Sequence, residues 1–373
     1  MKVKDAAVVK GLSGFYYDDQ MAIRGGAKQD GMVYLGEPKT GGFKTIRQPA
    51  ESASIMLLLD NGRVAFGDCV SNQYSGVGGR DRFFDAHEHI PFIEENILPR
   101  LKNLELTDFR SLAITFDNLE IKGERMPASI RYGVSQALLD AVAQSQSRTM
   151  SEVVAEEYGL EIATVECPIY AQTGDDRYLN VDKMIMKKVD IIPHGLFNSY
   201  EKIGDKGATL RKYLGWLKER IEKIGEPGYW PIIQCDVYGL LVEAFDNNLD
   251  LLADTLLTME QELSPYELRI EYPLDGGTKE KTIDYNRRLR AKLRERNCGV
   301  KISVDEWNNS IKDMQDFIEG EAVDLFQIKT PVYGSMHHTI EAILLCKKHG
   351  VGSYLGGSCS CYAWMAKVSS STN

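Results

Sequence analysis

The chain has 373 residues, of which 43% are hydrophobic and 26% are charged, and its formal net charge is −10. This composition is typical of a globular protein large enough for two domains. The negative charge argues against nucleic acid or an anionic membrane surface as a partner. No apolar run reaches the roughly 18 residues of a membrane span. Seven cysteines, an odd number scattered along the chain, favour a reducing cytoplasm over a disulfide framework.

The pattern of predicted elements changes near residue 160. Residues 1–160 are expected to form an α+β domain, in which SASIMLLLDNGRVAFGDC predicts two strands with a tight turn at Asn61-Gly62. The stretch SIRYGVSQALLDAVAQ has apolar side chains on one face at helical spacing. Over residues 161–373, short apolar runs alternate with charged helical segments, which indicates a parallel (β/α) barrel. The predicted fold class is therefore α/β, a barrel with an N-terminal capping domain.

Seven apolar runs in the second part are predicted as barrel strands. In chain order they are VECPIYAQ, KKVDIIPHG, YWPIIQCD, YELRIEYP, VKISVDEW, DLFQIKTP and HGVGSYLGGS. Helices are expected between them, for example over GATLRKYLGWLKERIEKIG and IDYNRRLRAKLRERN. The intervals between the runs suit βαβ units, which take roughly 30 residues each.

Four ionisable side chains end four successive runs. Asp236, Glu271 and Asp305 end the third, fourth and fifth runs, and Lys329 ends the sixth. Because the carboxyl ends of barrel strands face one pocket, we expect the three carboxylates and the amine to converge. Three hard oxygen ligands suit Mg²⁺, and an amine beside them suits a general base. The metal would accept a substrate carboxylate and stabilise the charge that develops when the neighbouring carbon loses a proton.

His194 ends the second predicted strand, across the barrel from the strand that ends at Lys329. The two side chains would then approach a substrate from opposite faces and remove a proton from either configuration at the reacting carbon. Two opposed bases would serve a racemase or a dehydratase equally well, so these enolate-forming reactions stay open as alternatives.

Two other motifs have competing interpretations. His337 and His338 start a predicted helix and are expected to be surface or capping residues. Gly76, Gly78 and Gly79 in SGVGGRD could cradle a phosphate, but no Lys-Ser/Thr follows them. We therefore expect a mobile loop over the site.

Eight stretches of the chain carry a specific family resemblance. They are FGDCVSNQYSGVGGRD, CPIYAQTGDDRY, DIIPHGLFN, IQCDVYG, RIEYPLD, SVDEW, LFQIKTP and GVGSYLGGSC. From about residue 1 to 359 the chain resembles the methylaspartate ammonia-lyase family of the enolase superfamily. The resemblance implies a modified TIM barrel with a capping domain, and elimination of ammonia from L-threo-3-methylaspartate to give mesaconate in glutamate degradation. It also implies Mg²⁺ as cofactor, K⁺ as activator and a homodimer.

The resemblance implies a role for each matching residue. Asp236, Glu271 and Asp305 would hold Mg²⁺. Lys329 would take the C3 proton of the (2S,3S) substrate, and His194 would contact the substrate and serve the other face.

The resemblance also implies substrate contacts outside the metal and the two bases. Gln172 and Gln327 would bind a substrate carboxylate or amine, and Gln73 would reach in from the N-terminal domain. Ser358 and Cys359 would contact the distal carboxylate through a hydroxyl and the backbone.

The similarity stops after GGSC. The family continues into an eighth strand, whereas this chain reads SCYAWMAKVSSSTN. We therefore expect a barrel truncated at its C-terminal strand, with strands one and seven facing each other across a gap. This feature keeps a different class of function open, a truncated paralogue that is non-catalytic or weakly active.

Overall fold

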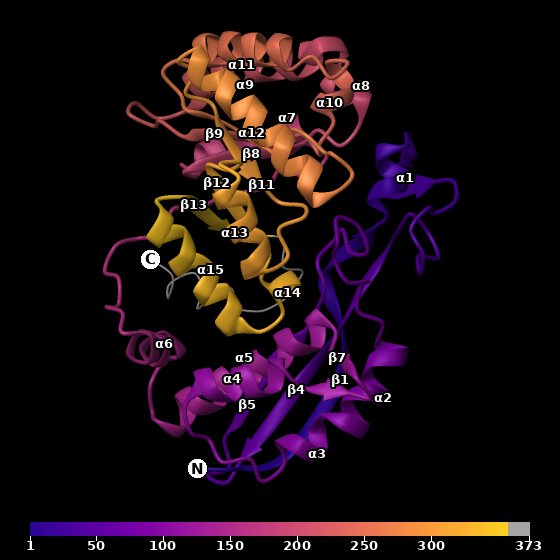
Figure 1. The fold of residues 1–373 in the computed structure, drawn as a ribbon, viewed down its shortest axis with the longest axis vertical. Helices are drawn as coiled ribbons and strands as arrows, with labels where there is room; N and C mark the ends of the chain where they lie inside the picture. Colours follow the sequence, from indigo (N-terminus) through magenta and orange to yellow (C-terminus); the bar gives the residue numbers. More distant parts are fainter. Residues whose placement is uncertain (357–373) are drawn as a thin grey trace.

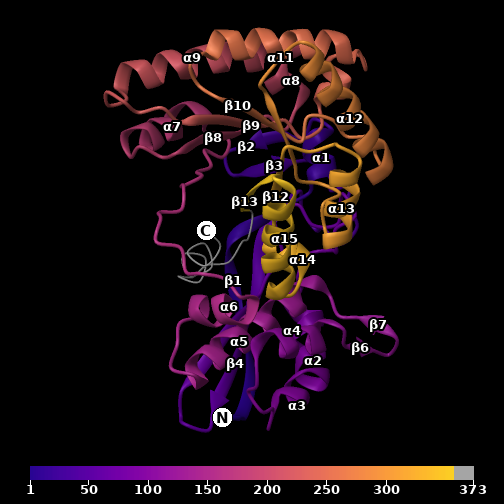
Figure 2. The same ribbon diagram turned by 60° about the vertical axis from the view of Figure 1, so that its left-hand side comes forward.

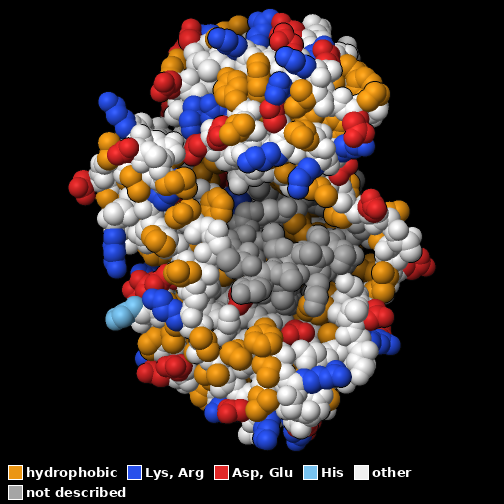
Figure 3. Space-filling model, turned by 180° about the vertical axis from the view of Figure 1, so that it is seen from behind, with side chains coloured by type: hydrophobic (Ala, Val, Ile, Leu, Met, Phe, Trp, Pro, Cys, Tyr) orange, Lys and Arg blue, Asp and Glu red, His pale blue; other side chains and the backbone are white. Residues whose placement is uncertain are grey.

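The computed structural model describes residues 1–356, which form an N-terminal domain and a parallel-stranded domain stacked along the long axis of the molecule (Figure 1). No helix among these residues combines the length and the apolar character that crossing a membrane requires. On the face shown in Figure 3, acidic and basic side chains are interspersed over both domains.

The N-terminal domain is built on a three-stranded antiparallel sheet in the order β1-β4-β5. Its strands are β1 (Val3–Asp18), β4 (Arg47–Leu59) and β5 (Val64–Cys69). The predicted hairpin between β4 and β5 is confirmed, and Gly62 supplies the positive φ of 85° that its turn needs. Between β1 and β4 the chain forms α1 (Gln20–Arg24), β2 (Lys28–Asp30) and β3 (Val33–Leu35). Figures 1 and 2 show that β1 and β4 carry this segment up to the height of the second domain.

Helices complete the N-terminal domain. They are α2 (Ala86–Asn96), α3 (Leu98–Leu101), α4 (Phe109–Asp117), α5 (Ala128–Ser145) and α6 (Met150–Tyr158), with the short strands β6 (Glu120–Ile121) and β7 (Glu124–Arg125) before α5. The predicted helix over SIRYGVSQALLDAVAQ is α5. It was expected to bury one face, but it is buried nearly all round, because the sheet covers one side and helices of both domains cover the other.

The contact between β5 and α5 depends on two glycines. A Cβ added to Gly67 of β5 would lie 2.1 Å from the carbonyl oxygen of Gly133 in α5. A Cβ added to Gly133 would lie 2.4 Å from Sγ of Cys69. Only glycine at both positions lets the helix backbone approach the strand this closely.

The second domain has a six-stranded parallel sheet in the order β13-β12-β11-β10-β9-β8. Its strands are β8 (Ile191–Leu196), β9 (Ile232–Asp236), β10 (Leu268–Glu271), β11 (Lys301–Val304), β12 (Leu325–Ile328) and β13 (Gly352–Leu355). They correspond to the second to seventh predicted runs, which are confirmed. The helices between them are α7 (Arg177–Met186), α8 (Tyr200–Ile203), a 3₁₀ turn (Asp205–Gly207), α9 (Ala208–Ile224), α10 (Leu241–Ala244), α11 (Leu249–Leu263), α12 (Lys279–Glu295), α13 (Ile311–Glu319), α14 (Thr330–Tyr333) and α15 (Met336–His349).

The first predicted run, VECPIYAQ, is not a regular strand in the structure. Tyr170 and Gly174 make only isolated parallel bridges to β8. Pro168 has no N–H to donate to a strand ladder. Ile169 is 61% exposed, so this segment also lacks the burial that stabilises the other strands. Within residues 1–356 the sheet is thus an open arc edged by β8 and β13. The expected loss of an eighth strand concerns residues after 356, outside the described part of the chain.

Two large hydrophobic cores lie in the two domains, and α15 joins the N-terminal core to a third, smaller cluster around β12. Most of the N-terminal core comes from β4, β5 and α5, but Met336 and Ile340 of α15 also belong to it. The backbone N–H of Met336 donates to Oγ of Ser135 in α5 at 2.8 Å. The segment that follows Lys329 is therefore anchored to the N-terminal domain.

Candidate active site

The carboxyl ends of four neighbouring strands carry the predicted acids and the lysine to one edge of the sheet. Asp236 and Glu271 end β9 and β10 and are direct partners in the register. Asp305 follows β11, and Lys329 follows β12. All four side chains belong to residues that are at most 7% exposed. The predicted convergence at one end of the sheet is therefore seen in the structure.

His194 lies against two of these acids. Its Nε2 is 3.0 Å from Oε2 of Glu271 and 3.8 Å from Oδ2 of Asp236. One ligand atom from each of the three residues lies within 4.8 Å of the others. His194 sits in β8 at a positive φ of 41°, a strained conformation for a non-glycine residue and one that recurs at functional sites.

Asp305 has different neighbours from the other two acids. Its Oδ1 accepts from Nη2 of Arg80 at 2.6 Å, and its Oδ2 accepts from Nζ of Lys329 at 2.5 Å. Two basic side chains thus contact this carboxylate. The structure brings Asp305 to the same strand edge, but not into the close group formed by His194, Asp236 and Glu271.

The electrostatics of the cluster are those of crowded buried carboxylates. Burial, followed by the charge of Glu271, raises the pKa of Asp236 well above its ordinary value. Glu271 shifts in the opposite direction: burial opposes ionisation, but the charge of His194 and its contact lower the pKa of Glu271. Each carboxylate therefore needs a cation beside it, because an unpaired buried charge destabilises the folded state.

The unsatisfied polar atoms show where a ligand would fit. Among the described residues, Oε1 of Glu271 and Oε1 of Gln234 are buried and have no hydrogen-bond partner. The other oxygen of Glu271 accepts from Gln234 at 3.0 Å and from Tyr170 at 3.3 Å. Buried oxygens without donors suit a metal ion, and clustered carboxylate oxygens are the donor set that Mg²⁺ prefers. The residues present therefore fit a divalent cation.

Tyrosine side chains line the same region. Tyr170 stacks edge-on against His194 with ring centroids 5.1 Å apart. The hydroxyl of Tyr238 donates to that of Tyr74 at 3.1 Å, which joins the second domain to the first. Burial raises the pKa of Tyr170, Tyr238 and Tyr74 well above the ordinary value, so these hydroxyls stay protonated and can donate.

The predicted substrate contacts lie in contrasting surroundings. Gln327 is 4% exposed, and its Oε1 has no hydrogen-bond partner among the described residues. Gln73 is buried in the N-terminal domain, where Nε2 donates to Oδ2 of Asp18 at 2.6 Å. Gln172 is exposed in the loop before α7. Ser358 and Cys359 lie outside the described residues.

Arg80, Gln20 and Glu306 join the two domains at the site and were not predicted from the sequence. Arg80 contacts Asp305 and also lies 3.5 Å from Oε1 of Glu306. Oε1 of Glu306 accepts from Nε2 of Gln20 at 2.9 Å. Arg80 directly follows the SGVGG stretch, so the glycine-rich loop was the available signal.

That loop packs on the segment after β11, while the mobility expected of it stays a prediction. The carbonyl oxygen of Gly78 accepts from N of Trp307 at 3.2 Å and from Nδ2 of Asn309 at 2.7 Å. Gly78 and Gly79 have positive φ angles and pack closely on Glu306 and Trp307. The glycines therefore fit the loop against the segment that carries Asp305.

Known proteins were found to match along almost the whole chain. Two family models match it: Methylaspartate ammonia-lyase N-terminus over residues 1–159, and Methylaspartate ammonia-lyase C-terminus over residues 161–372. Methylaspartate ammonia-lyase 1 of Carboxydothermus hydrogenoformans is 49% identical over 361 residues, which are 96% of this chain and 86% of that protein.

Solved structures agree with the sequence relatives. The Mg complex of β-methylaspartase from Clostridium tetanomorphum has a TM-score of 0.90 at 44% identity, covering 100% of this chain and 91% of that chain. The Citrobacter amalonaticus methylaspartate ammonia lyase containing (2S,3S)-3-methylaspartic acid has a TM-score of 0.92 at 43% identity, covering 96% and 87%. A mandelate racemase/muconate lactonizing enzyme-like protein from Rubrobacter xylanophilus, 13% identical with a TM-score of 0.65, covers 100% and 85% and shares the fold alone.

Proposed function

Because the chain belongs to the methylaspartate ammonia-lyase family and is thus a carbon–nitrogen lyase, we propose that it eliminates ammonia from L-threo-3-methylaspartate to give mesaconate. The observation that carries the proposal is the buried cluster of acids at the carboxyl ends of β9, β10 and β11, with Lys329 beside it. The relative that contains (2S,3S)-3-methylaspartic acid supports the choice of substrate.

Asp236, Glu271 and Asp305 would hold Mg²⁺ in this proposal. Oε1 of Glu271, which has no hydrogen-bond partner in the described part of the chain, and the mutual repulsion of the carboxylates support a cation at this place. The Clostridium relative described as a Mg complex supports the identity of the ion. When bound, Mg²⁺ supplies positive charge that stabilises the negative charge developing on a substrate carboxylate.

Lys329 is the proposed base that removes the C3 proton. It is 7% exposed and stands at the end of β12, on the Asp305 side of the cluster. Its amine must be unprotonated to accept the proton, and Asp305 provides the contact that holds Nζ in the site. Loss of ammonia from the neighbouring carbon then completes the carbon–carbon double bond of the product.

His194 is the proposed contact on the opposite side of the substrate. It belongs to β8, on the far side of the cluster from β12, and it touches Glu271 and Asp236 and not Asp305. The two bases thus flank the acids of β9, β10 and β11 from opposite sides. This placement supports a role for His194 toward the other configuration at C3.

Amide side chains would fix the rest of the substrate. Oε1 of Gln327 has no hydrogen-bond partner within residues 1–356 and would accept from the substrate ammonium. We further propose Gln73, Gln172, Ser358 and Cys359 as contacts of the substrate from the family resemblance. K⁺ activation, a homodimer and a cytoplasmic location belong to the proposal on the same ground.

Product analysis separates this function from the other enolate reactions. Purified protein with Mg²⁺ and L-threo-3-methylaspartate should release ammonia and mesaconate in equal amounts, measured by proton NMR and an ammonia assay. A racemase would convert the substrate to an isomer and release no ammonia. A non-catalytic paralogue would leave the substrate unchanged.

A further inference from the structure

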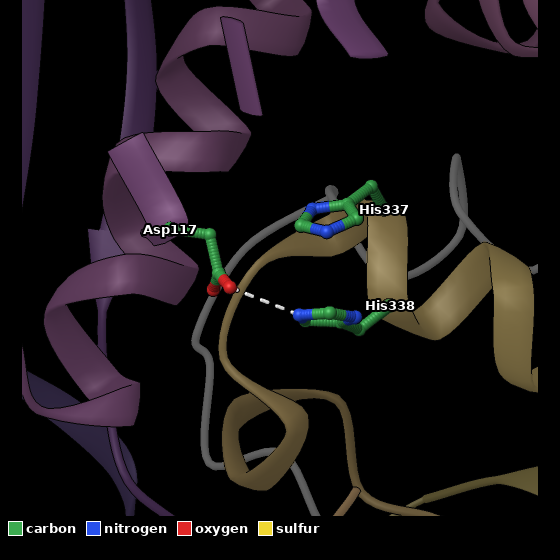
Figure 4. A group of neighbouring side chains, drawn as sticks. All are labelled: Asp117, His337 and His338. Carbon is green, nitrogen blue, oxygen red and sulfur yellow. Dashed lines mark hydrogen bonds and ion pairs between the residues drawn. The ribbon is translucent and has the colours of Figure 1, made fainter. Parts of the chain in front are cut away.

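A second cluster of metal-binding side chains lies where the N-terminal domain meets α15 (Figure 4). Asp117 ends α4, and His337 and His338 are in the first turn of α15. The histidines were predicted to be surface or capping residues. This prediction is wrong for His337, which is 4% exposed, because Asp117 and the N-terminal core pack against the start of α15.

The three side chains have the separation of metal ligands. One ring nitrogen of each histidine and one carboxylate oxygen of Asp117 all lie within 4.8 Å of one another. Nε2 of His338 is 3.0 Å from Oδ2 of Asp117, the contact drawn in Figure 4. The two imidazole rings are 3.9 Å apart between centroids. A small movement of these side chains would bring all three ligand atoms around one ion.

The second ring nitrogen of His337 has a hydrogen-bond partner, and that of His338 faces a carboxylate at a longer distance. Nδ1 of His337 lies 2.8 Å from Oγ of Ser335. Nδ1 of His338 lies 3.6 Å from Oε2 of Glu341. Metal-binding histidines usually engage the second ring nitrogen in this way, which fixes the tautomer and the ring orientation. Burial, followed by the charge of His338, lowers the pKa of His337 to about 4, so its ring is neutral.

We propose that Asp117, His337 and His338 form a second metal site, separate from the carboxylate cluster and suited to Zn²⁺ or a similar transition-metal ion. Two imidazole nitrogens favour Zn²⁺, Ni²⁺ or Cu²⁺ over Mg²⁺, which prefers oxygen ligands. Three protein ligands leave one position of a tetrahedral ion to water. The proposal does not depend on the lyase reaction.

Neighbouring basic side chains compete with a metal for Asp117. Nη1 of Arg131 donates to Oδ1 at 2.7 Å and can remain there as an outer partner. Arg125 and His338 share Oδ2, and the side chain of Arg125 is 51% exposed. A bound metal would displace Arg125 into solvent and take the place of any proton on Nε2 of His338. Arg110, which pairs with Glu341, is a further cation nearby.

The site would tie the N-terminal domain to the segment that follows Lys329. Gly334, between α14 and α15, packs on the guanidinium of Arg131, and a Cβ there would lie 2.4 Å from Nη1. A metal held by Asp117 and the two histidines would connect the end of α4 to the start of α15 at the same place. It would therefore stabilise the contact between the domains.

Zn²⁺ titration of the full-length protein tests the proposal. Mg²⁺ is kept in large excess to occupy the carboxylate cluster, and Zn²⁺ is partitioned against a chromophoric chelator. We expect one Zn²⁺ per chain, with affinity lowered by about tenfold or more in His337→Gln and in His338→Gln. His349→Gln is the matched control, because this exposed histidine lies on the same helix and should leave the affinity unchanged.

Arg125→Ala should change the Zn²⁺ affinity in the opposite direction from the histidine variants. Removing the exposed competitor should tighten Zn²⁺ binding, since it leaves Oδ2 of Asp117 available. Absence of Zn²⁺ binding in excess Mg²⁺ would overturn the proposal. Equal affinity in wild-type protein, His337→Gln and His338→Gln would also overturn it, as would weaker binding in Arg125→Ala.

Discussion

Arg80 of the N-terminal domain and Asp305 of the second domain form a buried ion pair, with Nη2 and Oδ1 2.6 Å apart and side chains only 2% and 3% exposed. The same guanidinium faces Glu306. The capping domain thus supplies a fixed cation to the carboxylate proposed as a metal ligand. The site is therefore complete only when the two domains are packed together.

Replacing Arg80 should destabilise the protein strongly. Arg80→Gln leaves Asp305 and Glu306 buried with less positive charge, and loss of one partner of a buried pair costs about 3–5 kcal/mol. The free energy of unfolding, measured by urea denaturation, should fall by that order. Arg211→Gln is the matched control, because Arg211 pairs with Glu262 at a side-chain exposure of 47% and should have little effect.

Mg²⁺ gives the Arg80 prediction a second readout. If Asp305 binds the cation, saturating Mg²⁺ should restore part of the stability lost in Arg80→Gln, because binding to the folded state raises its stability. An equal loss of stability in Arg80→Gln and Arg211→Gln would contradict the buried-pair argument.

The two proposed bases should differ in their preference for the configuration at C3. Lys329→Ala should lower kcat for the (2S,3S) substrate by about 10²–10⁴-fold, the usual contribution of a general base. His194→Ala should reduce the reaction of the C3 epimer more than that of the (2S,3S) substrate. Rates of both variants with both substrates check this, with the exposed Lys348→Ala as control. If each variant lost the same fraction of its rate on both substrates, the proposal of two opposed bases would be contradicted.

The sequence predicted the parallel strands and the convergence of acids because those features follow from local patterns. Apolar runs marked β8 to β13, and residues at their ends had to meet at one edge of the sheet. The division at 160 and 161 stays a prediction. The contacts made by Arg80 and Gln20 could not be predicted, because they join residues more than 200 positions apart across the domain interface. The first run was wrongly predicted as a regular strand because its exposure, seen at Ile169, cannot be read from its apolar composition.

Glycine at position 67 should be indispensable for packing. Gly67→Ala would place a methyl group against the backbone of α5, at 2.1 Å from O of Gly133 and 2.4 Å from N of Ala137. Because neither backbone atom can yield cheaply, the free energy of unfolding should fall by about 1–3 kcal/mol or more. Gly215→Ala is the matched control in α9: a Cβ there meets nothing within 4 Å, and alanine should stabilise the helix by about 0.5–1 kcal/mol. Thermal melts of both variants should therefore shift in opposite directions.

The ion pair between Arg24 and Asp275 should make stability depend on pH. Burial opposes ionisation, but the hydrogen bond from Arg24 at 2.8 Å lowers the pKa of Asp275 below its ordinary value of 3.8. The folded state thus keeps this carboxylate charged to lower pH than the unfolded chain does. Its contribution to stability is full above pH 3.8 and is lost as pH falls through the lowered pKa of the folded state.

Asp275→Asn tests this dependence. At pH 7 the variant should lose about 1.5–3 kcal/mol of unfolding free energy, as expected for a hydrogen bond to a charged group. The difference from wild type should shrink as pH falls below 3.8. Asp30→Asn, at an exposed position, controls for the change in net charge. A difference that stays constant with pH would show that the charge of Asp275 does not stabilise the fold.

The most direct test of the central claim is a continuous ultraviolet assay for a conjugated diacid with purified protein, L-threo-3-methylaspartate, Mg²⁺ and K⁺. The proposed lyase predicts steady growth of absorbance that stops when EDTA removes the metal and resumes when Mg²⁺ is restored. The same signal should be absent in Lys329→Ala. Folded protein that produces no absorbance change with this substrate, while still binding Mg²⁺, would contradict the proposed reaction.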